Sequence, residues 1–177
     1  MNGPSLSGKN VVLRPLAAAD NPRLVAWRNS DDVRLSSWNQ PPFTAGKQAA
    51  WYAKYLKDPG QVRFIIEHRE LGPVGCCGLT DIRREEATAV LAIFLGEPAA
   101  RGRGVAREAL RLLIAHAWKG LRLHRVTAEV FADNPAAIRL YEQVGFIREG
   151  RLRQAHRDAQ SGARVDVLVM GRLEPKS

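Results

Sequence analysis

The stretch RGRGVAREAL, residues 101–110, places two glycines and two arginines immediately before a segment with helical periodicity. Apolar residues recur there at three- and four-residue spacing, which predicts a helix over residues 105–119. The first turn of a helix carries unpaired backbone N–H groups and a partial positive charge. Glycines without a Cβ let an anion reach those amides, and arginines add charge in a geometry that suits phosphate. The stretch therefore predicts a pyrophosphate site, with a solvated turn carrying two surface arginines as the alternative.

Two other phosphate-binding loops are excluded by the sequence. A dinucleotide fingerprint would need a third glycine where Arg107 stands, and no GxxxxGK[ST] motif occurs in the chain. The anion site predicted here is thus of a different kind.

The segments on either side of this stretch predict one α/β domain. Residues 87–96 are apolar on both faces, as in a central strand, and further strands are predicted at 10–16, 62–69, 73–83, 125–131, 146–156 and 164–173. Asp20 and Thr44 are predicted caps of two early helices, and Asn134, Pro135 and Gly145 delimit a later one. The predicted order is β-α-α-β-β-β-α-β-α-β-β, a mixed sheet without an internal repeat or linker.

Composition and charge indicate which kinds of ligand, macromolecule or membrane the protein can bind. Lys and Arg number 27 against 18 Asp and Glu, a net charge of +9 that favours an anionic partner. No run of five like charges occurs, so direct nucleic-acid binding by a basic arm is not expected. The N-terminus lacks the apolar core that a signal peptide would have. The longest apolar run, residues 89–95, is too short to cross a bilayer. Cys76 and Cys77 are adjacent and show no metal-ligand spacing, so we expect reduced thiols and no bound metal. Reduced thiols and the lack of a long apolar segment together predict a cytoplasmic protein without membrane association.

The spacing Arg101-x-x-Gly104-x-Ala106 resembles the [QR]xxGx[GA] acyl-CoA signature of the Gcn5-related N-acetyltransferase (GNAT) superfamily. The residues that follow keep that superfamily's order, with Asn134, Tyr141 and Gly145-Phe146 downstream. The runs RLHRVTAEV and GFIREGRLR look like the branch that acetylates ribosomal-protein termini, polyamines and amino sugars. The resemblance implies a single N-acetyltransferase domain over residues 1–177. It also implies a mostly antiparallel sheet of about seven strands, splayed in the middle and flanked by about four helices.

The resemblance also implies which residues bind the cosubstrate, acetyl-CoA. The pyrophosphate would bind the backbone amides of Arg101, Gly102, Arg103, Gly104, Val105 and Ala106. The pantetheine arm would lie along a strand that ends Ile93, Phe94 and Leu95. Gly96 stands where the family often bulges this strand, which would leave a backbone N–H free to polarise the thioester carbonyl. Asn134 would contact the pantetheine, with a plain helix cap as the alternative.

Two residues are the catalytic candidates that the resemblance implies. The Tyr141 phenol would protonate the leaving thiolate, although Tyr141 also lies on the apolar stripe of its helix and could serve in packing. Glu129, five residues before Asn134, would take the proton of the amine, although a carboxylate on a strand can equally face solvent. Asp81 is a second candidate base, and a chain of water molecules is a third.

The acceptor is expected to be a primary amine: a protein N-terminus, an amino sugar or a small amine. Trp27, Arg28 and Asn29 are candidate acceptor-binding residues together with Asp81, while a solvated helix end with a core tryptophan is the alternative for the first three. The positive net charge argues against free polyamines, because a polycation would be repelled. A homodimer is compatible with the family. The competing hypothesis is a non-catalytic acyl-CoA sensor or ribosome-docking module, which would not need Tyr141 beside a carboxylate.

Overall fold

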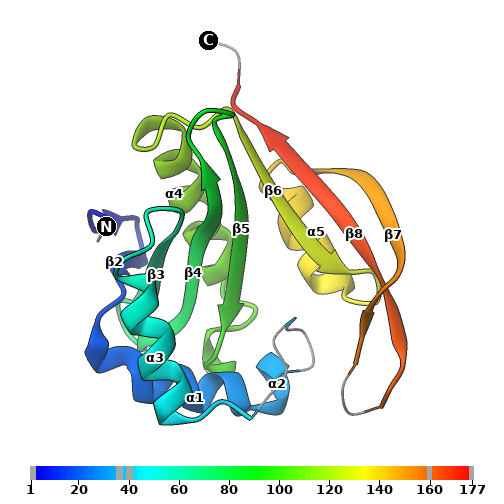
Figure 1. Cartoon of the computed structure of the whole chain (residues 1–177). Helices are drawn as coiled ribbons and strands as arrows, with labels where there is room; N and C mark the ends of the chain where they lie inside the picture. The colour runs from blue at the N-terminus through cyan, green and yellow to red at the C-terminus, as the bar shows by residue number, and fades with distance from the viewer. Residues whose placement is uncertain (1–2, 35–37, 39–41, 159–160, 176–177) are drawn as a thin grey trace.

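A computed structural model of the chain describes residues 3–34, 38, 42–158 and 161–175. Figure 1 shows one twisted sheet with helices on both faces. The described strands are β1 (Leu6–Ser7), β2 (Val11–Pro15), β3 (Val62–His68), β4 (Gly72–Arg83), β5 (Thr88–Leu95), β6 (Arg125–Phe131), β7 (Ile147–Arg157) and β8 (Arg164–Leu173). The described α-helices are α1 (Asn21–Asn29), α2 (Asp31–Arg34), α3 (Ala45–Tyr55), α4 (Val105–Lys119) and α5 (Pro135–Gln143).

The sheet has the strand order β1-β2-β3-β4-β5-β6-β8-β7. Every neighbouring pair is antiparallel except β5 and β6, which are parallel and joined by the crossover helix α4. This mixed, mostly antiparallel sheet confirms the predicted α/β fold. The short strand β1 and the one-turn helix α2 are additions that the sequence patterns did not predict.

The sheet opens between β5 and β6. The two strands are paired only from Thr88 opposite Arg125 to Val90 opposite Thr127, although β5 continues to Leu95 and β6 to Phe131. Beyond Val90, β5 stays paired with β4, and β6 stays paired with β8. Figure 1 shows the two halves of the sheet diverging below this point. The expected splay is therefore present, and it creates the space in which the candidate site lies.

Two apolar clusters cover the two faces of the sheet. Side chains of a strand alternate between faces, so Phe64 and Ile66 pack with the α4 and α5 cluster while Ile65 joins the smaller cluster under α1 and α3. The adjacent cysteines divide in the same way, Cys77 with the larger cluster and Cys76 with the smaller. Both cysteines are buried free thiols. This alternation decides which site residues lie on the same face of the sheet.

The predicted helix starts differ in outcome. Thr44 accepts a hydrogen bond from the Lys47 N–H at 3.2 Å, and Asn134 accepts one from the Ala137 N–H at 3.0 Å, so both caps are confirmed. The prediction for Asp20 is wrong, because its side chain makes no capping bond to α1. The Asp20 carboxylate instead accepts the Ala17 N–H at 2.9 Å and pairs with Arg14 at 2.7 Å.

Candidate active site

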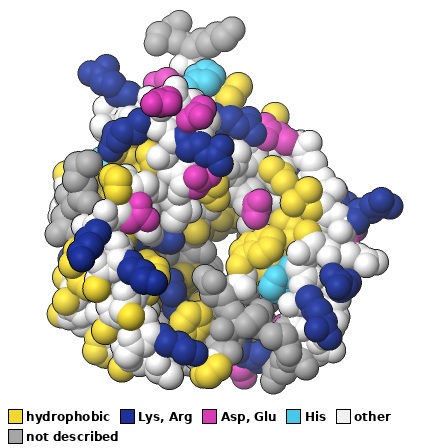
Figure 2. Space-filling model, in the orientation of Figure 1, with side chains coloured by type: hydrophobic (Ala, Val, Ile, Leu, Met, Phe, Trp, Pro, Cys, Tyr) yellow, Lys and Arg dark blue, Asp and Glu magenta, His cyan; other side chains and the backbone are white. Residues whose placement is uncertain are grey.

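A central cavity of about 640 Å³ occupies the opening between β5 and β6. Its walls come from β5, the end of β6, the start of α5 and the segment that contains α1 and α2. Figure 2 shows it as a deep hollow in the middle of the molecule. The lining residues that matter for the site are Arg28, Asp32, Arg63, Ile93, Phe94, Leu95, Arg101, Ala106, Glu129, Asn134 and Tyr141. Segments far apart in the chain therefore meet at one opening.

The turn before α4 presents bare backbone to solvent. Gly102 and Gly104 have φ angles of +73° and +75°, in the left-handed region that favours glycine. No heavy atom lies within 4 Å of a Cβ built at Gly102, and only an Arg107 nitrogen, at 3.7 Å, lies near one built at Gly104. Within the described residues, the N–H groups of residues 102–107 donate no hydrogen bond. The glycines are needed here for backbone conformation, and the conformation leaves a set of donors at a helix N-terminus open to an anion.

The two arginine side chains of this turn point to acidic neighbours. Arg101 lies 3.2 Å from the carboxylate of Asp32, and Arg103 lies 4.0 Å from Glu70. Arg101 and Ala106 line the central cavity, which joins the turn to the opening in the sheet. The backbone donors, rather than the arginine side chains, are thus the freely available groups.

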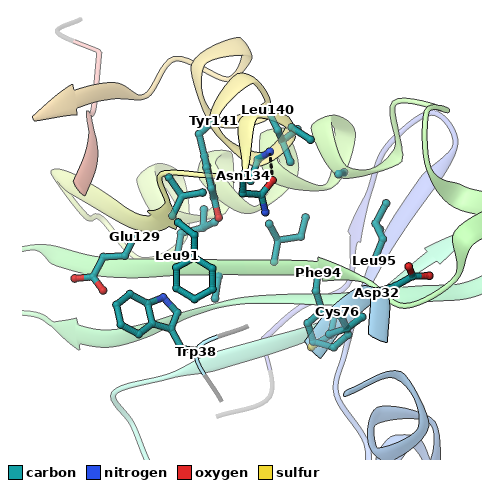
Figure 3. Close-up of a pocket in the computed structure, with 18 of the residues that line it drawn as sticks. Asp32, Trp38, Cys76, Leu91, Phe94, Leu95, Glu129, Asn134, Leu140 and Tyr141 are labelled. Carbon is teal, nitrogen blue, oxygen red and sulfur yellow. Dashed lines mark hydrogen bonds between the residues drawn. The ribbon is translucent and has the colours of Figure 1, made fainter. Parts of the chain in front are cut away.

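Asn134 starts α5 at the edge of the central cavity. Its side-chain oxygen accepts the Ala137 N–H, as the dashed line in Figure 3 shows, so the cap uses the oxygen. The side-chain NH2 makes no hydrogen bond within the described residues and remains a donor beside the cavity. One residue therefore serves as helix cap and also offers a donor to the cavity.

Tyr141 points from α5 into the central cavity (Figure 3). Its ring is 5% exposed and packs edge-on against Phe146 at a centroid distance of 5.4 Å. Its hydroxyl has no hydrogen-bond partner among the described residues, yet it is not among the side-chain oxygens sealed from solvent. Burial raises the pKa of Tyr141 well above the ordinary value, and the neighbouring Cys77 adds to this effect. The phenol therefore stays protonated at neutral pH, at the surface of the cavity.

Glu129 lies on β6 at the other face of the opening. Glu129 is exposed, whereas its neighbours Ala128 and Val130 are buried in the larger cluster with α4 and α5. Because side chains alternate along a strand, Glu129 faces the side of the sheet opposite α5, which carries Tyr141. Figure 3 shows the Glu129 carboxylate directed away from Tyr141. The two candidate catalytic groups thus approach the opening from opposite sides.

The close packing at the end of β5 explains why residue 96 is a glycine. The N–H groups of Gly96 and Glu97 both donate to the Val74 carbonyl, at 2.9 and 3.1 Å, so this end of the strand is irregular. The Gly96 amide is consequently engaged, so a backbone donor freed by the splay has to lie elsewhere on β5. A Cβ at Gly96 would collide with the ring of Trp27, whose indole N–H donates to Glu97 at 2.7 Å. The unpaired amides of β5 lie earlier, beyond Val90, where β6 has diverged.

Three of the four candidate acceptor residues lie away from the central cavity. Trp27 is a core residue, 4% exposed, against Gly96 and Phe94. Asn29 is exposed and binds the backbone of Phe43 with both its oxygen and its nitrogen. Asp81 is exposed, pairs with Arg83 at 2.7 Å and does not line the cavity, which also removes it as the second candidate base. Arg28 alone of the four lines the cavity.

Sequence patterns missed two charged residues that line the cavity. Arg63 lies on β3 and Asp32 on α2, and both reach the central cavity. Trp38 packs against Phe131 and His156, with ring centroids 5.4 and 5.2 Å apart, and forms an aromatic wall with them. The alternation of β3 places Arg63 and Ile65 on one face, but only the tertiary fold shows what that face contacts.

Comparison with known proteins was made on sequence and on structure. A family model described as an acetyltransferase (GNAT) domain matches residues 10–147. The spermidine N(1)-acetyltransferase of Vibrio cholerae is 28% identical over 143 residues, which cover 80% of this chain and 82% of that protein. An N-acetyltransferase 9-like protein of Nematostella vectensis is 33% identical over 155 residues, 81% of this chain and 78% of that protein. The crystal structure of the Vibrio cholerae spermidine N-acetyltransferase in complex with CoA and spermine superimposes with a TM-score of 0.87 at 25% identity. It covers 94% of this chain and 96% of that chain.

These findings confirm the predicted superfamily, whereas the ribosomal-protein type within it is not specifically supported. The described residues contain no group of three or more His, Cys, Asp or Glu side chains that could hold a metal ion. In the same part of the chain, no helix combines the length and apolar character that a membrane crossing requires.

Proposed function

The chain belongs to the acetyltransferase (GNAT) family, and on that premise we propose that it transfers the acetyl group of acetyl-CoA directly to a primary amine. One observation carries the proposal: the Tyr141 hydroxyl, which makes no hydrogen bond within the described residues, faces the opening between β5 and β6, in a cavity that Arg101 and Ala106 of the open-amide turn also line. A pure acyl-CoA sensor or ribosome-docking module would not need a neutral proton donor at this place.

Acetyl-CoA supplies a thioester, whose carbonyl carbon accepts a nucleophile and whose sulfur leaves as a thiolate. In the proposal, the N–H groups of residues 102–107 bind the diphosphate at the start of α4, where the helix dipole favours negative charge. Ile93, Phe94 and Leu95 flank the pantetheine arm along the unpaired edge of β5, and the Asn134 NH2 donates to it. The residues present therefore fit the cosubstrate.

The amine attacks the thioester without a covalent enzyme intermediate. A carbon–nitrogen bond forms, the carbon–sulfur bond breaks, and Tyr141 donates its proton to the departing sulfur. Glu129, on the opposite face, accepts the proton that the amine must lose, either directly or through water. Neither cysteine is suited to carry the acetyl group, because burial raises the pKa of Cys76 and Cys77 and so keeps both as thiols.

Titration calorimetry with CoA, followed by thiol release from acetyl-CoA across a panel of primary amines, tests the proposal. We expect CoA to bind and thiol release to depend on the amine. Binding without thiol release from any amine, peptide or amino sugar would favour the sensor. Because a related Vibrio cholerae enzyme is described as dodecameric, we also propose that this chain self-associates; light scattering will measure its mass in solution.

A further inference from the structure

Arg28, at the end of α1, and Arg63, on β3, line the central cavity without an acidic partner. Neither guanidinium makes a hydrogen bond or ion pair with any residue that the structure describes, and the Nε of Arg63 is sealed from solvent without a bond. Arg28 lies over the rings of Phe43 and Trp51, 5.2 and 5.5 Å from their centroids. Burial lowers the pKa of Arg28, and the nearby charge of Arg63 lowers it further. Two neighbouring cations therefore share one wall of the cavity.

Among the described residues, no carboxylate is positioned to neutralise this pair. The acidic residues that line the central cavity are Asp32, which pairs with Arg101 at 3.2 Å, and Glu129, three strands away from Arg63 in the sheet order. Residues 35–37 and 39–41, which the structure does not describe, contain no Asp or Glu. Within the part of the chain that the structure describes, the pair thus has no balancing negative charge.

Arg14 on the neighbouring strand shows how the same fold treats another partly buried arginine. Its guanidinium pairs with Asp20 and with Glu67, each at 2.7 Å. Leaving a cation desolvated and unpaired is costly, and two adjacent like charges add to that cost. A carboxylate or phosphate bound by both guanidiniums would offset it, because each can donate paired hydrogen bonds to such a group.

The alternation and register of the strands place Arg63 on the face of the sheet opposite α5, where Glu129 also lies. Arg63 is opposite Gly78, and Gly78 is opposite Ala92, which is exposed to the cavity on β5. A Cβ at Gly78 would lie 2.7 Å from the Cδ of Arg63, so the glycine lets the arginine stem cross β4 toward β5. Neighbouring strands lie about 4.8 Å apart, so Arg63 starts roughly 10 Å from Ala92 and its side chain spans part of that gap.

We propose that Arg28 and Arg63 bind an anionic group, a carboxylate or a phosphate, of the amine acceptor. This inference rests on the proposed function and names its substrate class: a compact primary amine that also carries a negative charge. Figure 2 shows basic side chains on the wall of the hollow formed by the β3–β5 half of the sheet, where a polycation would be repelled. The acceptor thus differs in charge from the spermidine named for the Vibrio cholerae relative.

Matched pairs of amines test the inference, with thiol release from acetyl-CoA as the readout. Glycine is compared with glycinamide, O-phosphoethanolamine with ethanolamine, and glucosamine 6-phosphate with glucosamine, with spermidine as the polycation. We expect the anionic member of at least one pair to have a kcat/KM about 10- to 100-fold above its neutral counterpart, as a charge-assisted bond predicts. A preference within the first pair would show that the acceptor's anionic group is a carboxylate. A preference within either of the other two pairs would show that it is a phosphate.

Arg63→Gln and Arg28→Gln identify the residues responsible. Each should lower kcat/KM for the preferred anionic amine about 10- to 100-fold and lower that of its neutral counterpart much less. The melting temperature should stay constant or rise, because an unpaired cation is removed; a merely structural arginine would lower it. Arg111→Gln, which removes an exposed arginine on α4 outside the cavity, is the control for net charge.

The outcomes separate the inference from the proposed function. Thiol release with neutral amines or spermidine, at rates equal to or above those of the anionic amines, overturns the inference and leaves acetyl transfer intact. Equal losses in Arg63→Gln for both members of a pair also overturn it. Absence of thiol release with every amine overturns the proposed function itself.

Discussion

Replacing Tyr141 with phenylalanine removes one oxygen atom from the wall of the central cavity and keeps the ring in place. The edge-on contact with Phe146 at 5.4 Å is retained, and the hydroxyl makes no hydrogen bond with the described residues. The free energy of unfolding should therefore change by less than about 0.5 kcal/mol. General acid catalysis typically contributes about 10²- to 10⁴-fold, so kcat should fall by that factor, equivalent to about 2.7–5.5 kcal/mol in the barrier.

Three measurements on Tyr141→Phe check this reasoning together. Thiol release gives kcat, titration calorimetry gives the Kd for CoA, and thermal melting gives stability; only kcat should change. Tyr52→Phe, the same chemical change on α3 outside the cavity, is the control and should leave all three unchanged. Because burial raises the pKa of Tyr141, ionisation of this phenol should not reduce the rate of the unsubstituted protein below about pH 10. An unchanged kcat in Tyr141→Phe, with CoA bound normally, would refute the role of this residue as the acid.

Three further predictions address the base, the anion-binding turn and the pH dependence of stability. Glu129→Gln should lower kcat/KM, and an unaltered kcat/KM would assign the proton transfer to water. Gly104→Ala should lower the free energy of unfolding by about 1–2 kcal/mol, because φ is +75° there, and weaken CoA binding measured by calorimetry. Gly150→Ala, where φ is not positive and the space is open, should alter neither quantity. Burial lowers the pKa of His116 below 6.5, so the unfolded chain binds more protons near that pH and stability should rise with pH through this range. In urea unfolding at pH 5.5 and 7.5, His116→Gln should reduce the difference between the two pH values, and an equal difference would contradict the assignment.

Helix ends and strand positions could be predicted where they depend only on residues close together in the sequence. The periodicity after residue 104 correctly predicts α4, and the caps at Thr44 and Asn134 form as expected. Asp20 failed as a cap because an arginine on a neighbouring strand binds its carboxylate more strongly than the helix start does. A cap can be inferred from a few adjacent residues, whereas a competing partner brought in by the sheet cannot.

In the candidate site too, some residues could be predicted from local sequence, whereas others required the tertiary structure. The glycine turn at residues 101–104 and the position of Tyr141 follow from motif order, because each lies within one helix and its entry. The selection of Arg28 over Trp27, Asn29 and Asp81 required the structure, since all four are plausible by residue type. Residue type states what a side chain can bind, and its surroundings decide whether it is available.

By itself, the sequence determined the order of the strands and helices other than β1 and α2, the bare amides at the start of α4 and the position of Tyr141 on α5, since these depend on neighbours within a few residues. Only the tertiary structure decided that β5 and β6 part after Val90, and that Glu129 and Tyr141 approach the opening from opposite faces. It also brought together two arginines 35 positions apart in the chain, at residues 28 and 63, with no carboxylate of the described residues beside them. Pairing between strands and the balance of buried charge are properties of contacts between distant segments, and local sequence patterns carry no record of them.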